Sequence, residues 1–192
     1  MLFCTEEDII CLIEHDEWML SLLKAAARLE LPDWWICAGA IRSKLWDVVH
    51  GYSSPTPLAD IDVIFFDPNN PNEAYEKELE QRLLSIQPGL PWSIKNQARM
   101  HIPNNLPPYK SSEDAISKFP ETATSIGISL SSSGAVILTA PWGIQDLIDL
   151  QVQPTPFFKA TPERLRVYEQ RMDQKQWDRI WPRLSIYRAD EQ

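Results

Sequence analysis

The sequence predicts an α/β fold of the α+β type, in which helices flank a mixed β-sheet. Two short apolar runs, at residues 34–38 and 60–66, are bounded by Gly, Pro and Asn, as is typical of buried strands. Longer segments with apolar residues three and four positions apart predict amphipathic helices. A Ser-Gly turn at residues 131–134 joins two further strand-like segments. Since strands and helices are interspersed, helices packed on one sheet are the expected architecture.

The N-terminal part of the chain predicts helix, strand and helix in succession. A capping-box pattern begins at Thr5, and apolar residues at helical spacing follow it, so we expect one or two helices over residues 5–31. A buried strand at residues 34–38 then leads to an amphipathic helix at residues 40–49. Gly39 lies between them, and we expect it to supply the free φ angle of a tight strand-to-helix turn.

The middle of the chain predicts two strands separated by a helix. A Ser- and Pro-rich loop at residues 51–57 precedes the strand at residues 60–66, which ends at an Asp-Pro-Asn-Asn turn. Asn72 is placed to cap a helix over residues 73–86. We expect a third strand at residues 92–100.

The second half of the chain predicts shorter elements. A Pro- and Asn-rich loop at residues 101–110 could fold over a site, and a Ser-capped helix then ends near residue 118. Residues 123–140 predict the hairpin, residues 144–150 a short helix and residues 162–177 the last helix.

We expect one domain over residues 1–192, with N-terminal helices at residues 5–31 and a C-terminal helical segment at residues 157–192 packed on it. The N-terminus lacks the basic region of a secretory signal, and no apolar run approaches the roughly 20 residues that cross a bilayer. Three cysteines without a C-x-x-C pair fit reduced thiols, and the three histidines lack zinc-ligand spacing. We therefore expect a cytoplasmic protein that does not bind membranes.

The charge balance restricts the partners of the protein. The formal net charge is −9 and the pI about 4.8. Binding to long duplex nucleic acid requires clustered Lys and Arg, so this composition argues against it. A nucleotide or a short RNA end, which needs only a local basic patch, stays open.

Two carboxylates carry the strongest chemical signal. Asp60 and Asp62 are two residues apart on a predicted strand, so their side chains project from the same face. Like charges so placed repel each other unless a cation lies between them or one stays protonated. A hard divalent ion, Mg²⁺ or Mn²⁺, bound by these carboxylates and by substrate phosphates would resolve the conflict. A solvated strand edge is the simpler alternative.

A candidate phosphate site lies just upstream. Gly39 and Ala40 stand where a helix begins, and free N–H groups at a helix start attract phosphate. Arg42 lies on the first turn, where its positive charge opposes the helix dipole and a bound anion would relieve the conflict. A metal site beside a phosphate site indicates nucleotide chemistry.

The predicted third strand offers two competing faces toward this site. Lys95 and Arg99 share one face and could form a basic wall opposite the carboxylates, or simply solvate the sheet. Asn96 lies on the other face and could offer an amide oxygen to a metal. Only one of these faces can line the site.

The ordered sequence A-G-A-I-R, helix, D-I-D-V-I-F-F-D resembles the DNA polymerase β-like nucleotidyltransferase superfamily. The segments WSIKNQARMH, FPETATSIGI and APWGIQDLIDL are similar to one bacterial branch of predicted nucleotidyltransferases whose substrate is unknown. The resemblance covers residues 34–181. A D-x-D pair alone is a weak signal, whereas the ordered set is much stronger.

The resemblance implies metal-dependent transfer of a nucleoside monophosphate from an NTP to an acceptor hydroxyl, on a small molecule, a protein or an RNA end. It implies that Asp60 and Asp62 are catalytic and bind Mg²⁺ or Mn²⁺. Two positions depart from the superfamily pattern: Ala40 replaces a Ser, and residues 92–100 lack the usual third carboxylate. The alternative is therefore an inactive module that binds a nucleotide or RNA; a phosphohydrolase would need more His or Asp ligands.

Overall fold

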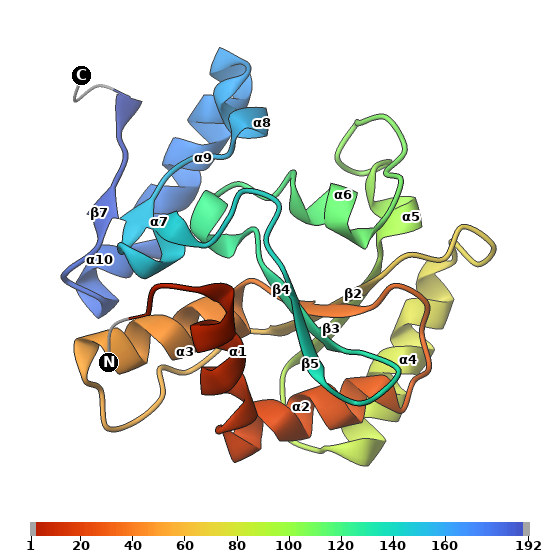
Figure 1. Ribbon diagram of the computed structural model, residues 1–192. Coiled ribbons are helices and arrows are strands. Elements are labelled where there is room, and N and C mark those ends of the chain that lie inside the picture. Colours follow the sequence, from red (N-terminus) through yellow and green to blue (C-terminus); the bar gives the residue numbers. More distant parts are fainter. Residues whose placement is uncertain (1–2, 190–192) are drawn as a thin grey trace.

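The computed structural model describes residues 3–189 and has a five-stranded mixed sheet at its centre (Figure 1). The strand order is β3-β2-β1-β4-β5, with β2 and β3 parallel and the other neighbours antiparallel. A separate pair of short parallel strands joins β6 to β7. The strands are β1 (Trp35–Cys37), β2 (Ile61–Phe65), β3 (Trp92–Asn96), β4 (Gly127–Leu130), β5 (Val136–Thr139), β6 (Gln151–Val152) and β7 (Ser185–Ile186).

Helices surround the sheet, and most of them begin with a side-chain cap. At the N-terminus the capping box predicted from Thr5 is formed with Asp8. The helices are α1 (Glu6–Glu14), α2 (Glu17–Ala27), α3 (Gly39–His50), α4 (Glu73–Ile86), α5 (Gln97–Met100), α6 (Ser112–Ile116), α7 (Gln145–Ile148), α8 (Pro156–Lys159), α9 (Pro162–Lys175) and α10 (Trp177–Ile180), with a 3₁₀ turn η1 at Thr122–Thr124. None of the helices in residues 3–189 is long and apolar enough to span a membrane.

One face of the sheet builds the main core. Ile36, Val63 and Ile94 stand side by side on β1, β2 and β3, and all three are fully buried. Apolar side chains of α1, α2, α3 and α4 pack into the same cluster. Figure 1 shows α2 and α4 together beneath this face. Burial of this continuous apolar face is the largest favourable contribution to folding.

The opposite face carries the polar residues of interest. Cys37, Asp62 and Ser93 are neighbours across β1, β2 and β3, so their side chains lie on this face. A small cluster of Cys37, Ile64 and Ile116 covers part of it, with Ile116 supplied by α6. Asp62, near the start of β2, lines a cavity together with Arg171, Lys175 and Trp177 of the C-terminal segment.

The C-terminal segment packs on α3 through tryptophans. Trp46 of α3 makes edge-on contacts with Trp177 and Trp181, with ring centroids 5.8 and 5.1 Å apart. The Trp181 indole N–H donates to Asp47 over 2.7 Å. Residues 156–189 hold eight of the 18 Lys and Arg residues but only four acids, so this segment is cationic in an otherwise acidic chain.

Most predicted elements are confirmed with small shifts of their ends. The helix predicted at residues 73–86 is α4, capped by Asn72 as expected. The predicted strand at residues 92–100 is wrong in its second half, because β3 ends at Asn96 and α5 follows. Asn96 itself causes the change: its side chain accepts from the N–H of Ala98 and starts the helix. The terminal residues 1–2 and 190–192 of the predicted domain lie outside the described part.

Candidate active site

The turn between β1 and α3 forms the first wall of the site. The expectation that Gly39 carries an unusual φ is wrong: Ala38 adopts the positive φ of 52°, with ψ of −106°, and Gly39 is the first residue of α3. A Cβ added to Gly39 would meet no atom within 4 Å. The glycine thus keeps open space beside the first N–H groups of the helix, as an approaching anion requires.

Asp60 and Asp62 stand at the start of β2 and line one cavity of about 280 Å³. Asp60, immediately before the strand, is exposed, whereas Asp62 is half-buried. The structure thus brings together the two carboxylates that the sequence singled out, and it places them in the same cavity as Ala38 and Gly39.

The electrostatics of Asp62 reflect this crowding. Burial and, after it, the negative charge of Asp60 raise the pKa of Asp62 to about 6, although a hydrogen bond with the Ser93 side chain opposes the shift. A carboxylate in this state has no sufficient positive partner of its own. A cation placed between the two acids would lower the pKa of Asp62 again.

Arg42 lies deep in the cavity wall within a cage of three tryptophans. Its guanidinium carbon lies 4.1 Å from the ring centroid of Trp177, 5.2 Å from that of Trp46 and 5.5 Å from that of Trp181. Burial lowers the pKa of Arg42 to about 10, so the side chain stays charged at neutral pH. One terminal nitrogen donates to Ser43, and the buried Nε has no partner within residues 3–189. The arrangement leaves donor capacity for an anion.

Two further cations enter the cavity from α9, and the sequence reasoning missed both. Arg171 and Lys175 line the cavity with Asp60 and Asp62. The available signal was their spacing of four residues in a cationic C-terminal segment, which puts both on one helix face. No local pattern indicated that this face would meet a D-x-D strand more than 100 residues away.

A buried acid holds Arg171 in place. Glu121 is fully buried and accepts the Arg171 Nε–H over 2.5 Å and the Thr124 hydroxyl over 2.7 Å. Within the described chain, Nε is the atom of Arg171 that hydrogen-bonds to protein. Its two terminal nitrogens therefore stay available as a fork for phosphate oxygens. The segment FPETATSIGI thus contributes to the site through Glu121.

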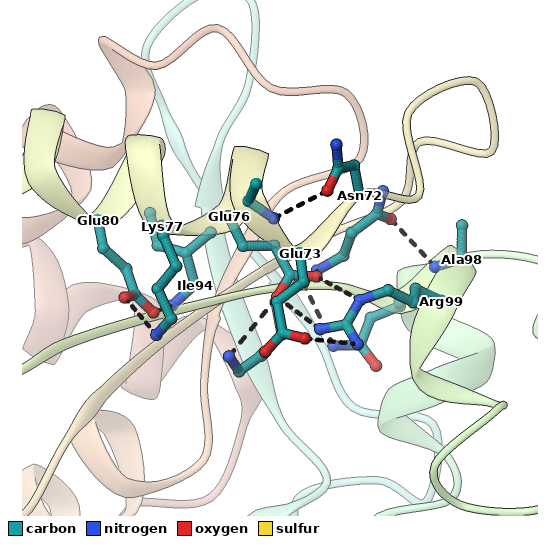
Figure 2. A network of polar contacts seen from close by, with 12 residues as sticks. Asn72, Glu73, Glu76, Lys77, Glu80, Ile94, Ala98 and Arg99 are labelled. Carbon is teal, nitrogen blue, oxygen red and sulfur yellow. Dashed lines mark hydrogen bonds and ion pairs between the residues drawn. The ribbon is translucent and has the colours of Figure 1, made fainter.

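Lys95, Asn96 and Arg99 are placed elsewhere, around the carboxylate of Glu76. Figure 2 shows Arg99 beside Glu76 in this polar network. The carboxylate of Glu76 on α4 is 3.5 Å from Lys95 and 2.8 Å from Arg99, and it accepts the Asn96 backbone N–H. Glu80 accepts the backbone N–H of Ile94 one turn later. The two glutamates thus cover the free edge of β3, and the basic residues neutralise Glu76.

Asn96 is a structural residue. It is fully buried, and its amide donates to the carbonyls of Asp67 and Asn70 while its oxygen accepts the Asp67 N–H. Its side chain lies on the core face, opposite to that of Asp62. The predicted role of Lys95, Asn96 and Arg99 in nucleotide binding therefore has no geometric support, since none of them lines the cavity.

The described part of the structure offers no third carboxylate beside Asp60 and Asp62 in the cavity. Ser93 is the residue opposite Asp62 on β3. Among the described residues no three His, Cys, Asp or Glu side chains form a metal cluster. The cavity nevertheless combines two carboxylates with three cations and a helix start, a set of groups that can hold a polyphosphate together with a divalent ion.

Comparisons with known proteins concern the fold and the family. An NMR structure described as revealing a CCA-adding enzyme head domain is 33% identical, with a TM-score of 0.85 over 96% of this chain and 97% of that chain. The Thermotoga maritima CCA-adding enzyme in complex with tRNA is 16% identical, with a TM-score of 0.52 over all of this chain and 44% of that chain. A CCA-adding enzyme in complex with ATP is 17% identical, with a TM-score of 0.55, and 45% of its chain is covered.

The chain therefore spans less than half the length of these two enzymes, and at such identities the likeness concerns the fold alone. No curated protein sequence matches the chain. The sequence profile of a nucleotidyltransferase family matches residues 24–186, which include every residue lining the cavity. The predicted superfamily and the predicted fold are thus confirmed, and the chain belongs to the nucleotidyltransferase family.

Proposed function

We propose that this protein transfers a nucleoside monophosphate from an NTP to an acceptor hydroxyl, using a divalent metal ion. The observation that carries the proposal is the meeting of Asp60 and Asp62 with Arg42, Arg171 and Lys175 in one cavity at the start of α3. Solved structures of similar fold that contain ATP or CTP support an NTP as the donor.

The cationic residues bind and orient the triphosphate. Arg42 and Arg171 offer free donors from α3 and α9, and the N–H groups at the start of α3 complete the phosphate site. Gly39 lines the catalytic cavity, whereas the predicted residue Ala40 follows it in the helix and lines the neighbouring cavity. Lys175 adds a flexible charge at the end of α9. The hydroxyl oxygen of the acceptor bonds to the α-phosphorus while the bond from that phosphorus to the bridging oxygen breaks, and pyrophosphate leaves with the electron pair. Asp60, the exposed acid, accepts the hydroxyl proton and passes it to solvent.

Asp60 and Asp62 are the residues that would hold Mg²⁺ or Mn²⁺. They fit such an ion because both carboxylates line one cavity, and because burial and then the charge of Asp60 raise the pKa of Asp62 although Arg171 and Lys175 oppose the shift, so a cation between the two acids would be favoured. Mg²⁺ is commonly bound by one or two carboxylates together with substrate phosphates, so a third protein acid is not required. When bound, the ion neutralises charge on the reacting phosphate oxygens.

The test combines binding with turnover. Mg²⁺ plus one of the four common NTPs should raise the melting temperature more than either does alone, by roughly 5–10 °C at a hundredfold excess over Kd. Pyrophosphate release should follow when an acceptor is present, and Asp60→Asn should abolish it while the protein stays folded. No synergy with any NTP would refute the proposal.

A second candidate function is a nucleotide-binding module without turnover. The composition of β3 favours it, because Ser93 lies opposite Asp62 and the strand carries no acid, whereas the resemblance implies a third carboxylate on this strand. The module would show the same synergy between metal and NTP but no pyrophosphate release with any acceptor. Turnover therefore decides between the two candidates.

A further inference from the structure

A second and larger cavity adjoins the catalytic one. Its volume is about 430 Å³, within the range of roughly 300–1,000 Å³ that is usual for small-molecule sites. It lies between the start of α2, the outer side of α3 and the loop of residues 52–58. Both cavities share part of their lining: Ser43, Thr56, Pro57 and Leu58. A molecule in the larger cavity therefore touches the segment that leads directly into Asp60.

The charged groups of this second cavity are already compensated. Asp16 forms an ion pair with Lys44, and Asp47 accepts the backbone N–H and the hydroxyl of Thr56 over 2.7 and 2.6 Å and the indole N–H of Trp181 over 2.7 Å. The two acids and one lysine of the second cavity give a net charge of −1. The catalytic cavity has three cations and two acids, so its net charge is +1 when all are ionised. An anionic ligand is thus favoured in the catalytic cavity and disfavoured in the second one.

The remaining lining suits an uncharged ring. Trp18 and Tyr52 line the cavity and are each 40% exposed, and Val48 and Leu90 add apolar walls. The hydroxyls of Ser53 and Ser54 hydrogen-bond to no residue of the described chain and can bind polar substituents. An apolar pocket with a few free hydroxyls is the usual composition of a small-molecule site.

We propose that the second cavity binds the non-reacting part of the acceptor, and that this acceptor is an uncharged, ring-containing alcohol. The inference rests on the proposed nucleotidyl transfer. The ring packs between Trp18 and Tyr52, and the reacting hydroxyl reaches past Thr56 toward Asp60. Its oxygen then forms the bond to the α-phosphorus, its proton passes to Asp60, and pyrophosphate leaves.

Binding is tested with matched probes on the full chain. A panel of uncharged ring-containing alcohols, including the four ribonucleosides, is titrated while the Trp18 indole resonance is followed by NMR, and each 5′-monophosphate serves as the anionic counterpart. At least one uncharged probe should shift the Trp18 resonance, with at least tenfold weaker binding of its monophosphate. A Trp18 resonance that no uncharged probe moves, or that the monophosphates move equally, overturns the proposal.

Transfer is tested with a variant that fills the second cavity at a residue that does not line the catalytic one. Leu90→Trp should raise the KM for the acceptor at least tenfold, while the melting shift caused by Mg²⁺ and NTP stays unchanged. Trp18→Ala should act in the same direction, and Trp142→Ala, another half-exposed tryptophan at neither cavity, should not.

The outcomes separate the two proposals. An intact melting shift with unaltered acceptor KM in Leu90→Trp overturns the acceptor cavity alone. If Mg²⁺ and NTP do not raise the melting temperature of the unmodified protein, the proposed nucleotidyl transfer itself is overturned. Equal transfer to a short RNA with a 3′-hydroxyl in the unmodified protein and in Leu90→Trp would place the acceptor elsewhere and likewise overturn the acceptor cavity.

Discussion

Replacing Asp62 by Asn should stabilise the metal-free protein in a pH-dependent way. In the folded state burial and Asp60 raise the pKa of Asp62 from 3.8 to about 6. The folded state therefore binds more protons than the unfolded state between about pH 4 and 6, so stability falls as the pH rises through this interval. A shift of about 2 units corresponds to about 3 kcal/mol, and partial hydration of Asp62 reduces this toward about 1 kcal/mol.

The Asn variant should thus match the natural protein at pH 4 and exceed it by about 1–3 kcal/mol at pH 8. For a chain of this length the gain is an increase of about 2–10 °C in melting temperature. Urea unfolding at a series of pH values, in the presence of a chelator, measures it. Asp60→Asn is the informative companion, because it removes one cause of the raised pKa and should flatten the profile. A less stable Asp62→Asn protein at pH 8 would show that Asp62 has a favourable buried partner, and the reasoning would fail.

Three further predictions concern Gly39, Glu121 and Asn96. Gly39→Ala should weaken NTP binding, because its Cβ fills the open space that we assign to the phosphates, and the melting temperature should not fall. Gly127→Ala is the contrasting variant: its Cβ would meet three atoms at 3.2 Å, so the melting temperature should fall. Glu121→Gln should reduce NTP affinity several-fold in calorimetric titrations, because Glu121 holds Arg171 in place. Adding Arg171→Gln to this variant should lower the affinity little further, since both substitutions disrupt the same ion pair. Asn96→Asp should cost about 1–3 kcal/mol in urea unfolding without tightening metal binding, since the buried amide loses its two donations; tighter Mn²⁺ binding would contradict its placement.

The sequence predicted the parts of the site that are close together along the chain. The period-two spacing of Asp60 and Asp62 and the helix after Gly39 are local patterns, and the structure places them in one cavity. Residues 92–100 misled the strand prediction because alternating polar residues suit a strand, whereas the Asn96 side chain caps a helix. That cap competes with strand continuation through a side-chain hydrogen bond, which hydrophobic periodicity does not register.

The cationic residues of the site could not be predicted from local sequence patterns, because tertiary contacts bring them to the cavity. Arg171 reaches the cavity because Glu121, 50 residues earlier, holds its Nε, and no spacing rule connects the two positions. Lys95 and Arg99 had the expected charge for a phosphate wall, yet the buried carboxylate of Glu76 on α4 attracts both. Charge complementarity across the fold decided which basic residues face the acids.

The tryptophan cage around Arg42 gives the protein an intrinsic optical reporter. Trp46, Trp177 and Trp181 lie within 5.5 Å of the guanidinium, measured from its carbon to each ring centroid. Indole emission responds to nearby charge, so an anion that binds Arg42 should change the fluorescence excited at the red edge of tryptophan absorption, where nucleotides do not absorb. Replacing Arg42 by Met should remove most of that response, although the chain contains eight tryptophans in all. Ligand arrival at the base of the cavity can thus be followed in real time without any label.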